Sequence, residues 1–409
     1  MYKGLKTVLL ITSLCISGNA LAIPFFSFDP RSLAMGNTGV ASGPTSTAVL
    51  FNPALLSTAG KDENFSLDLP IVGGRVADPN DLLSAVDDFS SANYVGNLDN
   101  ALAQLNSNPS PGNISAVQTA VSQLSNGLST LSDKAAVFDG GATIVLGVPN
   151  KTVGVGMYAN AYVIGGAVGD YTDSDKAQLD AIAADPTTCV PSCSVTLTSS
   201  VSGRALLLSE VGVSLSHQFD IGGLEVAVGA TPKFTSATTY DYNFTGSDLD
   251  NADINLEDGK RTDSAFNVDL GAATDLGQNW SAGLAIRNLI NHDFETAQSG
   301  PIKIRPQARA GVSRHTDRST VSLDVDLTEN DQATFETKTQ FVALGAEFDV
   351  YKTVQLRVGY RNNLSASGGF PASTMSAGVG FSPFGAHVDL AVAGNSDEVG
   401  GALRLGFSF

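Results

Sequence analysis

The sequence is poor in the residues that catalytic and nucleic-acid-binding proteins use most. Its 409 residues include three cysteines, four histidines and one tryptophan, and only 16% of them are charged. The 23 lysines and arginines are outnumbered by 41 aspartates and glutamates, which gives a formal net charge of −18. A chain this acidic has no basic surface to release counterions from phosphates, so its composition argues against nucleic acid as a partner.

Recognisable reaction chemistry is also missing from the sequence. The histidines are scattered without metal-ligand spacing, at His217, His292, His315 and His387. We find no Gly-x-Ser-x-Gly motif and no phosphate-binding loop. The sequence therefore predicts no catalytic residues, no cofactor and no metal site, and we do not expect an enzyme.

Beyond its first residues, the chain lacks the long apolar run that a membrane-spanning helix needs, roughly 18 residues or more. Residues 1–22 are typical of a cleavable signal peptide, with Lys3 and Lys6 before an apolar stretch and Ala20-Leu21-Ala22 at the cleavage site. The protein is therefore expected to be exported. It should be either soluble or a β-barrel, because only helices and closed barrels span lipid.

What the sequence does contain is alternation of apolar and polar residues, clearest at its end. Leu403, Leu405, Phe407 and Phe409 share one face of a predicted strand. A soluble sandwich could end in such an edge strand. A terminal phenylalanine is also characteristic of the last strand of bacterial outer-membrane barrels, in which Phe409 would contact the barrel-assembly machinery.

Similar alternation recurs about 14 times, and short turns fall on one side of the strands while long connections fall on the other. This asymmetry favours the barrel. We expect an all-β fold, an antiparallel transmembrane barrel of about 14 strands over residues 61–409. It would lie in the outer membrane of a Gram-negative cell, in contact with lipid.

Charged residues occupy the opposite face of the predicted strands and should point into the lumen, because charge is costly in lipid. Counting from the turns places Arg309 opposite Asp326 and Asp389 opposite Arg404. These pairs would tie the wall together, although a role in substrate gating is an alternative. The expected lumen charges are Lys303, Arg305, Arg309, Asp324, Asp326, Glu347, Asp349, Arg357, Arg361, Asp389 and Arg404.

Residues 23–60 do not alternate, and they carry two motifs ahead of the barrel. The stretch from Ser27 to Ala41 and the Asn-Pro-Ala at 52–54 resemble the N-terminal hatch of the FadL-type outer-membrane transporters for hydrophobic compounds, and the layout is most similar to the conjugal-transfer TraF-type branch. The matching residues are Arg31, Ser32, Leu33, Met35, Gly36, Gly39, Val40, Ala41, Asn52, Pro53 and Ala54.

The resemblance implies a plugged barrel in which a hydrophobic molecule, such as a long-chain fatty acid, displaces the hatch and leaves through the wall. In the alternative, the segment only fills the lumen, and the protein is a conjugal-transfer or other envelope-assembly component without transport activity. A barrel enzyme is a third possibility that no residue pattern supports.

Two insertions interrupt the series of predicted strands. Residues 78–134 show helical periodicity and predict an extracellular αα-hairpin joined through residues 106–112, with Asn113 as a candidate N-cap. It would either cap the barrel mouth or bind a partner that the sequence does not identify. Cys189 and Cys193 lie in another outer loop, where an oxidising compartment favours a disulfide. The Cys-x-x-x-Cys spacing does not fit a thioredoxin-like redox site.

Overall fold

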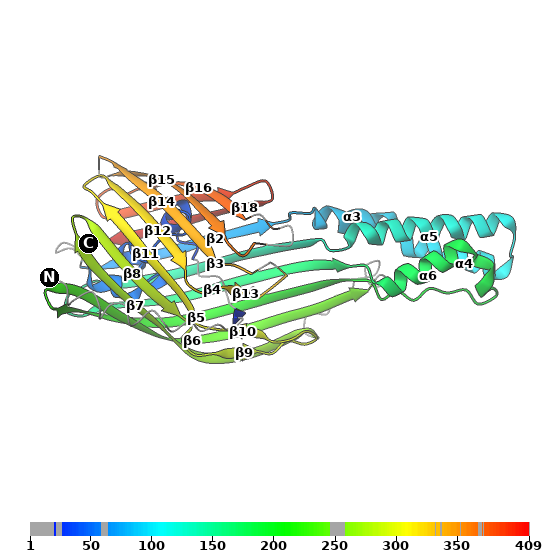
Figure 1. The fold of residues 1–409 in the computed structure, drawn as a ribbon, viewed down its shortest axis with the longest axis horizontal. Helices are drawn as coiled ribbons and strands as arrows, with labels where there is room; N and C mark the ends of the chain where they lie inside the picture. Colours follow the sequence, from blue (N-terminus) through cyan, green and yellow to red (C-terminus); the bar gives the residue numbers. More distant parts are fainter. Residues whose placement is uncertain are drawn as a thin grey trace, which may run out of the picture.

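The computed structural model is a closed antiparallel β-barrel with helices projecting from one end (Figure 1). It describes residues 20–21, 27–58, 64–245, 258–331, 333–335, 338–351, 353–366, 370 and 372–408. The barrel has 14 strands in the order β11-β12-β14-β15-β16-β17-β18-β2-β3-β4-β5-β6-β7-β8. The predicted fold class and strand number are confirmed.

The strands fall into two groups by length. A short group of 8 to 11 residues consists of β8 (Trp280–Arg287), β11 (Gln307–His315), β12 (Ser319–Asp326), β14 (Phe341–Val350), β15 (Val354–Asn363), β16 (Ser373–Phe381), β17 (Ala386–Gly394) and β18 (Glu398–Ser408). A longer group of 12 to 22 residues consists of β2 (Ser66–Ala77), β3 (Ala135–Val148), β4 (Gly154–Asp170), β5 (Ser200–Ile221), β6 (Leu224–Thr245) and β7 (Lys260–Gly277). Several of the long strands therefore extend well beyond the short ones toward the helices (Figure 1).

The two faces of the wall differ in polarity, as alternation requires. The outer face carries exposed apolar side chains, such as Leu207 and Val211 on β5 and Val358 and Tyr360 on β15. The inner face holds buried polar and charged side chains. The predicted registers of the two ion pairs are confirmed, because Arg309 pairs with Asp326 and Asp389 with Arg404 across adjacent strands.

Two irregularities interrupt the expected alternation. The run of alternating apolar residues from Ile302 to Val312 is split at Arg305–Pro306 into β10 (Ile302–Ile304) and β11, since proline cannot donate a ladder hydrogen bond. In β2, the register shifts between Asp68 and Ile71 on both sides of the strand. The shift reverses the facing of the residues that follow, so Ile71 is buried inside instead of continuing the outer apolar face.

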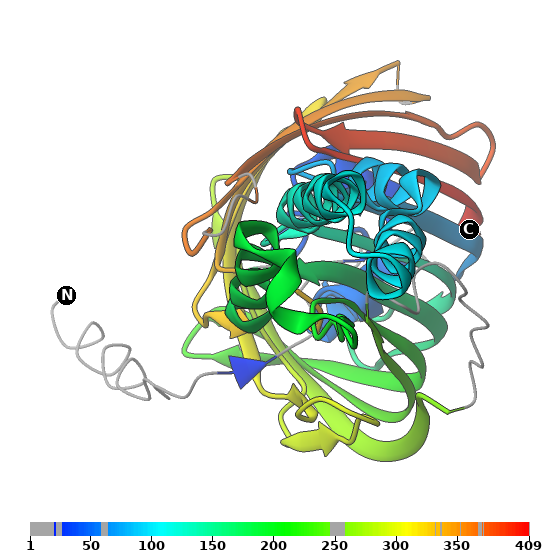
Figure 2. The same cartoon turned by 90° about the vertical axis from the view of Figure 1, so that its right-hand side faces the viewer.

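The insertion after β2 contains three helices rather than the expected two: α3 (Leu82–Ala92), α4 (Tyr94–Ser107) and α5 (Pro111–Leu131). The first predicted helix is divided at Asn93, which adopts a left-handed conformation that ends α3. The N-cap of α5 is Ser110 rather than Asn113, because the Ser110 hydroxyl accepts the Asn113 amide and Pro111 opens the helix. Figure 2 shows these helices in front of the barrel mouth.

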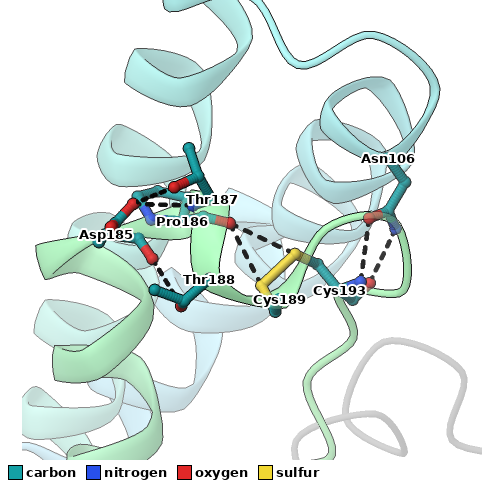
Figure 3. Close-up of a disulfide and its surroundings, with 7 residues drawn as sticks. All are labelled: Asn106, Asp185, Pro186, Thr187, Thr188, Cys189 and Cys193. Carbon is teal, nitrogen blue, oxygen red and sulfur yellow. Dashed lines mark hydrogen bonds between the residues drawn. A yellow bond between two sulfur atoms is a disulfide. The ribbon is translucent and has the colours of Figure 1, made fainter.

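The loop between β4 and β5 packs beside these helices. It holds α6 (Asp173–Ala184), η3 (Pro186–Cys189) and a disulfide between Cys189 and Cys193. Asn106 at the end of α4 both donates to the Cys193 carbonyl and accepts from the Cys193 amide (Figure 3). Although burial raises the pKa of the Asp175 carboxyl, hydrogen bonds from Ser199 and Thr198 hold that pKa below its usual range.

The remaining elements are short. β9 (His292–Phe294) pairs with β10, and β1 (Ala20–Leu21) pairs in parallel with β13 (Asn330–Asp331). Apart from Ala20 and Leu21, the predicted signal peptide lies outside the described residues, as does Phe409. Among the described residues, no helix is long and apolar enough to cross a membrane.

Replacing Asn106 by alanine removes both hydrogen bonds between α4 and the disulfide loop and leaves the disulfide intact. Together the two bonds contribute about 2 kcal/mol, so we expect amide hydrogen exchange in residues 186–199 to become roughly thirtyfold faster through local opening. Hydrogen exchange with mass spectrometry measures this. Ser107→Ala is the matched control, because within the described part of the chain the Ser107 hydroxyl bonds only to the Gln104 carbonyl of its own helix. Equal exchange in both variants would contradict the role of Asn106.

Candidate functional site

Residues 27–58, here called the luminal segment, fold inside the barrel into three short helical turns. These are α2 (Pro30–Ala34), η1 (Thr45–Leu50) and η2 (Pro53–Ser57). The sequence starts two of them in the same way, with a capping side chain followed by proline. Asp29 accepts from the Ser32 amide, and Asn52 accepts from the Ala54 amide.

The luminal segment packs against the wall all around the barrel. Its first arm, residues 29–41, lies on β15 to β18 through α2 and reaches β8, β11, β12 and β14 through Met35 to Ala41. Its second arm, residues 45–57, lies on β2 to β7 through η1 and η2. All 14 strands therefore contact the segment, and it fills the lumen at its level.

Glycines on the wall make this close packing possible. Three pairs of glycines face each other across neighbouring strands, at Gly229 and Gly271, Gly283 and Gly311, and Gly345 and Gly359. A Cβ on Gly359 would meet the backbone of Met35 and Gly36, one on Gly283 that of Val40, and one on Gly229 that of Pro53 and Ala54. The luminal backbone thus rests directly on the backbone of the wall. We call these six residues the glycine track.

A closed circuit of ion pairs holds the first arm. Arg31 binds both oxygens of Glu347 on β14, each at 2.9 Å. Glu347 also accepts from Arg357 at 2.6 Å, and Arg357 contacts Asp389. Asp389 accepts from Arg404 at 2.6 Å, and Arg404 lies 3.1 Å from Asp29, which returns the circuit to the luminal segment. These six residues form the charge loop, and all are at most about one-tenth exposed.

A carboxylate and a guanidinium fix the bend after α2. Asp324 on β12 accepts from the amides of Gly39 and Val40 at 2.9 and 3.0 Å. Arg309 on β11 donates to the Asn37 carbonyl at 3.1 Å while binding Asp326 at 2.6 Å. Buried backbone groups that would otherwise lack partners are satisfied in this way.

The second arm is held mainly by apolar packing. Val49, Phe51, Leu55 and Leu56 are buried in one cluster with Ile71, Val145, Tyr158, Ala227 and Ala273 of the wall. Its central polar contact is Asn52, whose amide donates to the carbonyls of Val40 and Ala272 at 2.9 and 3.0 Å. Asn52 therefore joins the two arms to each other and to β7.

An apolar cluster occupies the lumen next to the first arm, on the side toward the helices. It joins Phe28 and Leu33 of the luminal segment to side chains from the long strands and from the β9–β10 hairpin. The other large members are Tyr162, Ile164, Leu206, Leu208, Phe294, Ile302 and Ile304. On β5, Leu206 is fully buried inside, whereas its neighbour Leu207 is 40% exposed outside. We call this group the upper-lumen cluster.

The structure brings most of the predicted site residues together. Arg31, Met35, Gly36, Gly39, Asn52, Pro53 and Ala54 all contact the wall, and Arg309, Asp324, Asp326, Arg357, Asp389 and Arg404 line the lumen. Arg305 does not join them, because the break at Pro306 leaves it in a loop beside Asp293, 2.5 Å away.

Other buried charges were not singled out from the sequence. Lys233 lies 3.1 Å from both Glu210 and Asp269 inside the wall. Asp29, Asp68 and His387 were also missed. Strand parity could have indicated His387, two residues from Asp389, but the shift in β2 hides Asp68 from any such count.

Comparison with known proteins gives one family match. The family model described as "F plasmid transfer operon, TraF, protein" matches residues 49–326. A comparison with curated protein sequences finds no match.

Solved structures share the fold at very low sequence identity. The Ralstonia pickettii toluene transporter TbuX is 13% identical, with a TM-score of 0.51 over 93% of this chain and 98% of its own. The P. putida toluene transporter TodX is 11% identical, with a TM-score of 0.50 over 93% and 98%. A Pseudomonas aeruginosa FadL homologue is 9% identical, with a TM-score of 0.51 over 95% and 99%. The chain therefore has the FadL-type barrel fold.

Replacing Gly359 by alanine should push the luminal segment off the glycine track, because the new methyl group would collide with the backbone of Met35 and Gly36. We expect a loss of about 1–3 kcal/mol in the free energy of unfolding, as for other overpacked sites. Urea unfolding in detergent, followed by circular dichroism, measures this loss. Gly203→Ala on β5 is the control, because its Cβ would meet nothing within 4 Å. Equal urea midpoints for the two variants would argue against close backbone packing at the glycine track.

Proposed function

This chain belongs to the family of F plasmid transfer operon TraF proteins, and we propose that it is an outer-membrane channel whose luminal segment acts as a hatch for a hydrophobic small molecule. The observation that carries the proposal is the upper-lumen cluster, which places an apolar surface directly against the first arm of the luminal segment. The hydrocarbon channels with the same fold support it by their shared architecture.

The outer surface supports placement in a membrane. Strands of roughly 9–11 residues cross a bilayer, and the short strands have that length. At the end with short turns, Tyr351 and Phe384 are almost entirely exposed, and Trp280, Phe348 and Phe381 are about half-exposed. Aromatic side chains of this kind line the membrane interfaces of outer-membrane barrels. In this placement the short turns are periplasmic, and the helices α3 to α6 are extracellular.

The lumen supports an apolar cargo. The lumen of a water-filled barrel is lined by polar residues, yet inward positions of β4 and β5 carry Tyr162, Ile164, Leu206 and Leu208. In the structure, the β9–β10 hairpin covers them with Phe294, Ile302 and Ile304. A long-chain fatty-acid-like molecule that displaces these side chains would keep the surface dry. It would also touch Phe28 and Leu33, and so contact the hatch itself.

The contact of the luminal segment with the whole circumference of the wall favours a second function. The luminal segment contacts every strand, and the helices extend far from the barrel (Figure 1). A conjugal-transfer or other envelope-assembly component that presents its helices to a partner, without transport, would have the same features. The two functions differ in whether the purified barrel binds apolar molecules.

Leu206→Ala tests the channel proposal. The substitution removes apolar contact inside the lumen, and we expect the affinity for a fluorescent fatty-acid probe or a monoaromatic hydrocarbon to fall about tenfold, which corresponds to about 1.4 kcal/mol. Leu207→Ala is the matched control on the outer face of the same strand, and its affinity should be unchanged. Fluorescence titration and native mass spectrometry of the purified barrel measure binding. An unaltered protein that binds no apolar probe, in a folded barrel, would favour the envelope component.

A further inference from the structure

Three residues lie in a row across the seam where the last strand closes on the first. Gly406 of β18 is paired with His387 of β17 on one side and with Asp68 of β2 on the other. Nε2 of His387 reaches past Gly406 to within 2.5 Å of Oδ1 of Asp68. A Cβ on Gly406 would overlap both atoms. The missing side chain is thus what allows an imidazole and a carboxylate two strands apart to meet.

The pair is buried and joined to the charge loop. His387 is 7% exposed and Asp68 is fully buried. Asp68 also lies 3.7 Å from Nε of Arg404, the residue that contacts Asp29 of the luminal segment. Arg404 therefore links the His387–Asp68 pair directly to the first arm of the luminal segment.

The net charge of the charge loop and Asp68 depends on whether the His387 imidazole is protonated. The charge loop and Asp68 together contain four carboxylates, at Asp29, Asp68, Glu347 and Asp389, and three guanidinium groups, at Arg31, Arg357 and Arg404. With all four carboxylates ionised, a protonated His387 makes the sum zero, whereas a neutral His387 leaves one negative charge uncompensated. An uncompensated buried charge is strongly unfavourable.

We propose that protonated His387 is a latch for the luminal segment, and that its deprotonation loosens the first arm. With a neutral imidazole, Arg404 is the one cationic partner that Asp68 has among the described residues. The Arg404 guanidinium must then compensate the charges of Asp29, Asp68 and Asp389 together, and its interaction with Asp29 weakens. The arm is thus held tightly while the imidazole is protonated and loosely once it is neutral, and histidine is the side chain that proteins use for a change of charge near neutral pH. The latch rests on the proposed hatch function, because it regulates that same segment.

The second arm provides an internal reference. It is held by apolar packing and by the neutral side chain of Asn52. Ser32 in the first arm and Ser57 in the second are both buried, and each hydroxyl donates to a backbone carbonyl, at 2.8 and 3.2 Å. Ser32→Cys and Ser57→Cys are therefore matched, nearly isosteric thiol probes. The natural Cys189 and Cys193 are joined in a disulfide, and Cys15 belongs to the predicted signal peptide.

The experiment measures maleimide labelling of each cysteine variant of the purified barrel between pH 5.5 and 8.5. The ratio of the Ser32→Cys rate to the Ser57→Cys rate cancels the ordinary effect of pH on thiol reactivity. We expect this ratio to rise about tenfold with pH, the size that about 1.4 kcal/mol produces. With His387→Gln added, the ratio should be high at every pH. With Asp68→Asn added, which removes the charge that needs the imidazolium, it should be low at every pH.

Three outcomes would overturn the latch: a flat ratio in the otherwise unaltered barrel, an unchanged pH profile with His387→Gln, or a profile that only Asp29→Asn abolishes. The last would assign the proton to the Asp29 carboxyl. If the His387→Gln variant does not assemble into a barrel, the pH profile of the labelling ratio with Asp68→Asn tests the latch by itself. Labelling needs no ligand, so failure of the latch leaves the channel proposal standing, and an absence of ligand binding leaves the labelling result readable.

Discussion

The rest of this structure depends on the short distance between the main chain of the luminal segment and that of the wall. The luminal backbone lies directly against the backbone of the wall, because the glycine track removes the side chains that would separate them. Packing this close excludes water, so each polar group at the contact needs a protein partner. Asp324 supplies one for two amides and Asn52 for two carbonyls. The abundance of glycine and the buried polar network are thus two consequences of one constraint.

The two arms of the luminal segment are held by different forces. Apolar packing on the second arm does not depend on direction and weakens gradually as surface is exposed. The charge loop on the first arm depends on every member, because removal of one partner leaves another charge buried and unpaired. A disturbance at one ion pair is therefore felt around the loop, from Glu347 to Arg404. The first arm responds to charge, and the second anchors the segment while it does so.

Much of the fold could be predicted because strand alternation is a local property. The 14 strands, the polarity of both faces and the Arg309–Asp326 and Asp389–Arg404 registers all follow from counting residues out from turns. The rest depends on contacts between distant segments. Nothing local indicates that Asp29 meets Arg404, that Phe294 turns into the lumen, or that Gly406 leaves room for His387. Counting outward from a turn fails beyond two points: the shift in β2, which puts Ile71 inside, and the break at Pro306, which leaves Arg305 in a loop.

The seam links assembly of the barrel to the fixing of its plug. Arg404 lies on the last strand, whereas Asp29 precedes the first, and Asp68 lies on the first strand itself. The wall members of the charge loop lie on β14 to β18, whereas Asp68 meets Arg404 only when β18 has paired with β2, the contact of greatest sequence separation in the barrel. Before that step, Asp68 would lack both His387 and Arg404, and burying its carboxylate would be costly. Closure of the barrel therefore completes the set of partners around Arg404, which also binds Asp29, so the closed barrel and the seated first arm stabilise each other.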